Sequence, residues 1–293
     1  MLIVSNIDFL EFIPLNSKKC EVKAKQPLDQ ITEIEIPSTY EGLEVCQIAE
    51  NAFSNCINLV SIEIPDTITK IKRYAFNKCS SLKKVKLPKK LTLLDEGLFK
   101  GCTSLETVDI PKGVTKINRE AFCDCSSLSL VVIPEEVSKI NAHTFYGCSS
   151  LKSVCFPKKL ERICDYAFKE CTSLEDIDIP DNTSVIAFAA FGTCSSLKHV
   201  KLPNNLNRLD DCAFASCKSL ESIAIPNGVT KLTGYVFEHC VRLKEVFIPD
   251  TMKEIDNIAF SNCRSLKEVV VPGSCFVHDR ESYFTYIPRF IYK

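Results

Sequence analysis

Phenylalanine recurs every 23 residues through most of this chain, and that period constrains the fold more than any other feature. The ten copies stand at positions 53, 76, 99, 122, 145, 168, 191, 214, 237 and 260. The same period places cysteine from Cys56 to Cys263, leucine from Leu59 to Leu266, and proline from Pro65 to Pro272. A fixed period of about 20–50 residues is the signature of stacked repeats. The sequence therefore predicts a solenoid.

One unit, residues 65–88, shows how each coil is expected to fold. Its segment 82–87 has the L-x-x-L-x-L form of a leucine-rich repeat strand, and period-two alternation puts Val85 and Leu87 on one face. Pro88 has no N–H to donate to a sheet, so it ends the strand. Residues 74–79 are predicted to form a short helical or 3-10 turn, with Phe76 and Cys79 facing the core.

We therefore predict a right-handed leucine-rich-repeat superhelix with one parallel β-strand per 23-residue coil and short helical or 3-10 turns. Ten repeats are assigned to residues 37–272 and an N-terminal β-hairpin-like cap to residues 1–36. Residues 273–293 are predicted to form an aromatic C-terminal cap, with an exposed docking tail as the alternative. This last segment holds Phe276, Tyr283, Phe284, Tyr286, Phe290 and Tyr292.

The unit I-P-x-x-hydrophobic-x-x-I-x-x-x-A-F-x-x-C-S-S-L-x-x-hydrophobic-x-I-P strongly resembles the BspA-like leucine-rich repeats of bacterial and protist surface proteins. Residues 111–134 and 203–226 carry it almost unbroken, and residues 36–53 resemble the family's entry segment. The resemblance implies a leucine-rich repeat fold. It also implies a role as an adhesin that binds extracellular matrix or host proteins.

Seventeen cysteines raise the question of disulfides. Ten of them share the 23-residue period, and the remaining seven do not: Cys20, Cys46, Cys123, Cys155, Cys164, Cys212 and Cys275. Equivalent side chains on successive coils point the same way, which is poor geometry for a disulfide. We expect a ladder of reduced, inert thiols and hence a reducing compartment, with sporadic disulfides or metal binding as alternatives.

Charge and hydropathy limit the partners. A net charge of −1 argues against nucleic acid, and the longest apolar runs are too short to span a bilayer. The first residues show no basic region of a signal peptide, so we favour a cytoplasmic location, with the cell surface implied by the resemblance. We expect a monomer that binds protein ligands.

The recognition surface is predicted on the outward face of the strands. Apolar patches rimmed by charge are typical of protein interfaces, and the expected outward positions contain such patches between a basic and an acidic cluster. The candidate partner-binding residues are Lys84, Lys86, Asp109, Leu130, Val132, Cys155, Asp176, Asp178, His199, Lys201, Glu245, Phe247, Glu268 and Val270.

Catalytic chemistry finds little support. None of the four histidines shares a period with another, and the common nucleophile, zinc and phosphate motifs are missing from the sequence. The paired carboxylates Asp176 and Asp178 leave a solenoid hydrolase as a remote alternative. We predict a protein that is not an enzyme and needs no cofactor or metal.

Overall fold

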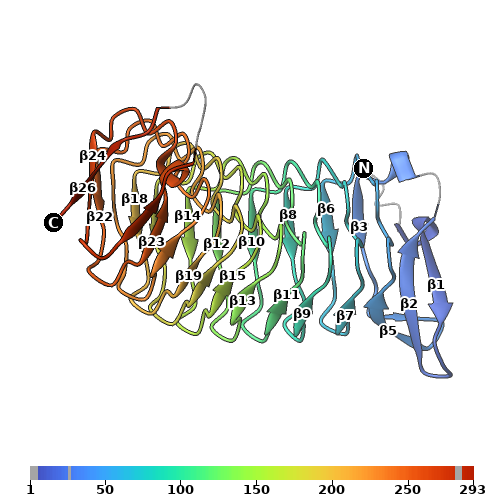
Figure 1. The fold of residues 1–293 in the computed structure, drawn as a ribbon. Helices are drawn as coiled ribbons and strands as arrows, with labels where there is room; N and C mark the ends of the chain where they lie inside the picture. The colour runs from blue at the N-terminus through green and yellow to red at the C-terminus, as the bar shows by residue number, and fades with distance from the viewer. Residues whose placement is uncertain (1–5, 26–27, 281–285) are drawn as a thin grey trace.

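The chain winds into a β-solenoid of parallel coils, as predicted (Figure 1). The computed structural model describes residues 6–25, 28–280 and 286–293. Within these ranges the helical elements are three short 3-10 helices, η1 (Asn6–Phe9), η2 (Leu28–Gln30) and η3 (Asn257–Phe260). No helix in the described ranges is long and apolar enough to span a membrane.

Each coil contributes one strand to a first row of parallel strands. This row contains β3 (Glu33–Glu35), β6 (Ser61–Glu63), β8 (Lys84–Lys86), β10 (Thr107–Asp109), β12 (Leu130–Val132), β14 (Ser153–Cys155), β16 (Asp176–Asp178), β18 (His199–Lys201), β20 (Ser222–Ala224), β22 (Glu245–Phe247), β24 (Glu268–Val271) and β26 (Arg289–Tyr292). Successive strands lie side by side in the order of the chain.

The structure adds a second row that the prediction of one strand per coil did not include. It contains β5 (Leu43–Ile48), β7 (Lys70–Ile71), β9 (Leu93–Leu94), β11 (Lys116–Ile117), β13 (Lys139–Ile140), β15 (Arg162–Ile163), β17 (Val185–Ile186), β19 (Arg208–Leu209), β21 (Lys231–Leu232), β23 (Glu254–Asp256) and β25 (Phe276–His278). Most of these strands are two residues long, too short to show an alternating pattern in the sequence.

The segment around each repeated phenylalanine is not helical, contrary to the prediction, except at η3. In the unit of Phe76, the N–H of Asn77 donates to Tyr74 O within the coil, at 3.1 Å. The N–H of Phe76 instead donates to Leu98 O of the next coil, at 3.0 Å. Tyr74 and Lys78 have left-handed φ angles of 55° and 57°. A helix would use every N–H locally, whereas stacking of coils requires alternate N–H groups to point along the solenoid.

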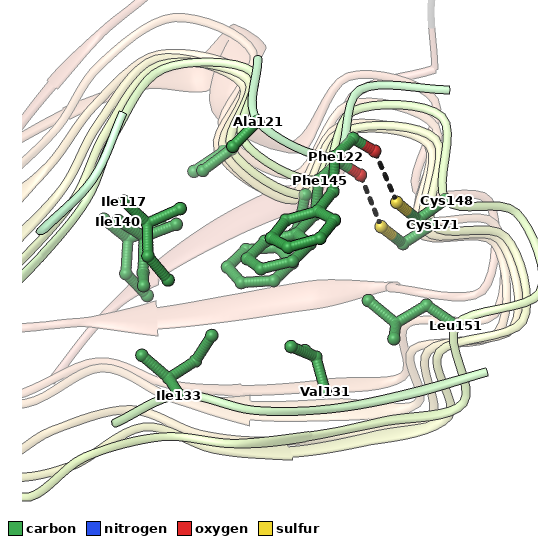
Figure 2. Packing of buried hydrophobic residues seen from close by; sticks show 14 of the residues in the cluster. Ile117, Ala121, Phe122, Val131, Ile133, Ile140, Phe145, Cys148, Leu151 and Cys171 are labelled. Atoms are coloured by element: carbon green, nitrogen blue, oxygen red, sulfur yellow. Dashed lines mark hydrogen bonds between the residues drawn. The ribbon is translucent and has the colours of Figure 1, made fainter. Parts of the chain in front are cut away.

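The ten phenylalanine rings form a continuous stack along the centre of the solenoid. All are fully buried, and neighbouring ring centroids lie 5.2–5.9 Å apart with interplanar angles of 2–18°. Figure 2 shows Phe122 over Phe145, with Val131 of β12 and Ile133 just after that strand on one side, and Ile117 and Ile140 of the second row on another. The stack therefore fills the space between both rows.

The ladder cysteines have a partner that explains their repetition. The thiol of Cys148 donates to Phe122 O of the preceding coil at 3.2 Å, and Cys171 donates to Phe145 O at the same distance (Figure 2). The same bond recurs at 3.0–3.3 Å for Cys79, Cys102, Cys125, Cys194, Cys217, Cys240 and Cys263. The thiol is thus small enough for the core and also a hydrogen-bond donor there.

At the N-terminal end, β1 (Leu10–Pro14) and β2 (Lys19–Ala24) form an antiparallel hairpin. Strand β2 pairs with β5 in parallel, and β4 (Thr39–Tyr40) pairs with β5 in the antiparallel sense. At the C-terminal end, β25 pairs with β23 and β26 with β24. The ring of Phe290 lies 6.4 Å from that of Phe260. Tyr283 and Phe284 lie outside the described residues.

Replacing Phe145 by alanine should lower the free energy of unfolding by about 3–5 kcal/mol, because it leaves a cavity in the middle of the ring stack. The matched control is Phe247→Ala, since that ring is 60% exposed. We expect this control to cost less than about 1 kcal/mol. Urea unfolding of both variants makes the measurement. Equal costs for the two changes would contradict the assignment of Phe145 to the core.

Stability should fall in alkaline solution because of the buried thiols. Burial raises the pKa of Cys56 to about 12 and that of Cys171 well above its usual range. An unfolded thiol titrates at about pH 8.5. The unfolded chain therefore loses protons first as pH rises, so the stabilisation is complete below the unfolded pKa and is lost as pH rises through the folded pKa.

We expect the free energy of unfolding to decline above about pH 8.5, by up to about 1.4 kcal/mol per pH unit for each buried thiol whose pKa is raised, such as Cys56 and Cys171. Urea unfolding at a series of pH values measures this decline. Cys148→Ala, which removes one buried thiol, should make the decline shallower. A free energy of unfolding that stays constant above about pH 8.5, where the thiols of the unfolded chain ionise, would contradict the burial of the ladder thiols in the folded chain.

Candidate recognition surface

Every candidate residue that the sequence analysis placed on the outward face of the strands is exposed in the structure. In the three-residue strands of the first row the middle residue points to the core and its two neighbours point outward, as in the pattern exposed, buried, exposed of β8. We call the outward residues of β3 to β26 the strand face. It holds all fourteen candidates, Lys84, Lys86, Asp109, Leu130, Val132, Cys155, Asp176, Asp178, His199, Lys201, Glu245, Phe247, Glu268 and Val270.

Parallel pairing arranges the strand face into two columns. The first outward residue of each strand belongs to the first column, and the second outward residue belongs to the second column. The register places Lys84 beside Thr107 and Lys86 beside Asp109, and likewise Asp176 beside His199. Equivalent positions of successive coils are thus neighbours, about 4.7–4.9 Å apart. A partner that lies along the solenoid meets one residue of each column per coil.

The middle of the strand face is apolar. Leu130 and Val132 on β12 are 44% and 57% exposed, and the exposed Cys155 lies beside Val132 in the register of the strands. We call these three residues the central patch. A shallow depression on one side of this central patch is lined by Asp109, Ile110, Lys112, Leu130, Val132 and Pro134. A second, on the other side, is lined by Cys155, Phe156, Lys158, Asp178, Asp181 and Lys201. The central patch is therefore flanked by hollows with charged rims.

The basic cluster predicted around Lys84 and Lys86 lies on the strand face, but acidic residues of the neighbouring strands lie beside it. Lys86 lies between Asp109 on β10 and Glu63 on β6 in the register of the parallel strands. Among the described residues, neither Lys84 nor Lys86 has a carboxylate within 4.0 Å. Both ammonium groups thus face solvent without a close ion pair.

The acidic cluster lies two strands beyond the central patch. Asp178 pairs with Lys201 at 3.1 Å, and Glu175 pairs with Lys198 at 2.7 Å. The ammonium of Lys198 lowers the pKa of the Glu175 carboxyl, and a hydrogen bond from the Asn204 N–H lowers the pKa of Asp181. These carboxylates are therefore ionised and partly neutralised by the next coil.

A second apolar strip occupies the C-terminal end of the strand face. Ala224, Phe247, Val270 and Ile291 follow one another on four successive strands, and Phe247 and Val270 are 60% and 46% exposed. The sequence did not identify Ile291 as part of the strand face, because it follows Val270 by 21 residues and not by the repeat period of 23. The register of β24 and β26 shows its place.

The described ranges contain no group of three or more His, Cys, Asp or Glu side chains that could hold a metal ion. His239 and Cys240 are adjacent in the sequence, but they do not form a nucleophile pair, because the Cys240 thiol is buried and donates to Phe214 O at 3.2 Å. The Nε2 atom of His239 is instead near Asn262 Nδ2, at 3.4 Å.

Solved structures of bacterial leucine-rich repeat proteins are similar to this chain. A leucine-rich repeat protein from Bacteroides ovatus is 24% identical, with a TM-score of 0.76 over 98% of this chain and 89% of that one. One from Eubacterium ventriosum is 17% identical, with a TM-score of 0.54 over 94% and 97%. A leucine-rich cell surface protein from Faecalibacterium prausnitzii is 25% identical, with a TM-score of 0.49 over 88% and 92%. The first two support the leucine-rich repeat fold.

No curated protein matches the sequence. The BspA type leucine-rich repeat region, a pattern of six copies, matches residues 46–175 and again residues 161–286. The two matches together include most of the chain and every repeated phenylalanine. The chain is therefore a member of the BspA type leucine-rich repeat family.

Proposed function

We propose that this protein is a non-catalytic scaffold that recognises a protein partner through the strand face. The observation that carries the proposal is the central patch, where Leu130 and Val132 expose about half of their side chains to solvent. Exposed apolar clusters with a charged rim are typical of protein interfaces. Here the rim is supplied by Lys84 and Lys86 on one side and by Asp176 and Asp178 on the other.

The fold supports this proposal because it holds the surface rigid. The middle residue of β12, Val131, is buried in the core, so the backbone that carries the two outward side chains is anchored. A preformed surface loses little conformational entropy on binding. The two depressions beside the central patch could receive side chains of the partner.

A crosslinking experiment tests the proposal. Cys155 is the one exposed cysteine, and the described ranges include all seventeen, so a thiol-linked photo-crosslinker can be directed to the strand face. In the control, Cys155→Ser with Lys116→Cys moves the crosslinker to the exposed face of the second row. We expect a discrete protein adduct from source cells with the first label and none with the second.

Val132→Asp places a charge in the central patch and should weaken binding of that partner at least tenfold, about 1.4 kcal/mol. Titration of the captured partner against wild-type protein and variant measures the loss. The same adduct from both label positions, or an unchanged affinity in Val132→Asp, would contradict recognition through the strand face.

A further inference from the structure

The charges on the strand face reverse sign about its apolar centre. Two strands before β12, strand β8 presents Lys84 and Lys86; two strands after it, β16 presents Asp176 and Asp178. One strand farther out on each side, the second column has Glu63 on β6 and Lys201 on β18. Every charged position in these four strands thus has an opposite charge at the mirrored coil.

A surface that changes sign about its centre is complementary to itself after a two-fold rotation. We propose that the strand face binds a second copy of this chain, with the two-fold axis lying between the two faces, parallel to the strands and directly over β12. This rotation reverses the order of the coils in the second copy. Each residue therefore faces a residue of the same column on the coil at equal distance on the other side of β12. The facing pairs are Lys84 with Asp176, Lys86 with Asp178, Glu63 with Lys201, Leu130 with Leu130 and Val132 with Val132.

The remaining positions between β6 and β18 are compatible with this arrangement. Thr107 faces Ser153, Asp109 faces Cys155, and Ser61 faces His199, so no two like charges are opposed. The strands of the two sheets run in nearly the same direction, as in aligned sheet packing. The apolar side chains of β12 meet at the centre, where water is most easily excluded.

The position of the two-fold axis is specific, because moving the axis along the solenoid or turning it brings like charges of the two copies together. An axis between β12 and β14 would set Asp109 opposite Asp178 of the second copy. An axis over β16 would set Asp178 opposite Asp178 of the second copy. A two-fold axis along the solenoid instead exchanges the columns, which sets Lys84 opposite Lys86 and Asp176 opposite Asp178. Of these arrangements, only the one centred on β12 pairs opposite charges throughout.

The size of the surface predicts a weak dimer. Seven strands from β6 to β18 span roughly 29 Å at the sheet spacing, and each strand is about 10 Å long. This is smaller than a standard stable interface, so we expect reversible association in the micromolar range. Because opposed charges at the rim contribute to it, the association should weaken as salt is added. This state differs from the monomer expected from the sequence.

The inference rests on the proposed function of the strand face and names the partner. Sedimentation equilibrium of the purified chain over a range of concentrations and salt tests it. Lys86→Glu and Asp178→Lys should each weaken self-association at least about tenfold, because two facing pairs per dimer become repulsive. Both side chains are exposed, and the ion pair between Asp178 and Lys201 is exposed and contributes little to stability, so neither change should prevent folding. Lys116→Glu, the same charge change on the second row, should leave the association unchanged.

A mixture of the two single variants, Lys86→Glu and Asp178→Lys, is the decisive sample. In the heterodimer the two substituted positions face each other with opposite charges, and the unchanged Asp178 of one copy faces the unchanged Lys86 of the other. The heterodimer should therefore recover to within about threefold of the wild-type affinity.

A wild-type chain that stays monomeric at all concentrations, or a mixture that does not recover, would overturn the second copy as partner. If the Cys155 crosslinker then still captures a different protein, the strand face keeps its proposed function. If it captures none, both proposals fail.

Discussion

The structure depends on the stacking of identical side chains at the spacing of parallel strands. Each phenylalanine ring lies nearly parallel to the next, at 5.2–5.9 Å between centroids, and the ladder thiols bond to the phenylalanine carbonyl of the preceding coil. Both contacts join neighbouring coils, and neither can form within one coil. A single coil therefore has no core of its own, and the stability of the array comes from the contacts between neighbouring coils.

This constraint separates the inward positions from the outward ones. A larger side chain at an inward position would clash with the equivalent residues of the two neighbouring coils, so phenylalanine, cysteine and leucine recur at fixed positions. The outward residues lie beside their equivalents on the neighbouring strands and face away from the core. They are free to differ from coil to coil, and on this chain they run from basic to apolar to acidic between β8 and β16. The physical requirement of stacking thus leaves one surface on which recognition can be built.

Much of this architecture follows from the sequence, because its period exposes which residues are equivalent. Val85, Leu87 and Phe76 were predicted to face the core and are buried there, and Leu130 and Val132 were predicted to face solvent and do. The second row of strands was missed because a pair such as Lys139-Ile140 is too short to show alternation. The turns were misjudged because their N–H groups bond alternately within a coil and between coils, which no local pattern reveals.

The charge of the strand face was also only partly predictable. Lysines 83, 84, 86, 89 and 90 look like a basic cluster in the linear sequence, yet Glu63 and Asp109 flank Lys86 from coils 23 residues away in each direction. Ile291 joins the C-terminal apolar strip across a 21-residue spacing that the repeat period hides. Both features depend on lateral neighbours, which the register of the sheet determines.

Alkylation of the native protein, followed residue by residue with mass spectrometry, tests most directly that the core is fixed and the strand face is open. All seventeen cysteines lie in described ranges; Cys155 is exposed, Cys212 is half-buried, and the rest are buried. The account predicts rapid modification of Cys155, slower modification of Cys212, and protection of the ladder thiols until the chain unfolds. Ladder thiols that react as fast as Cys155 in the native state would contradict it.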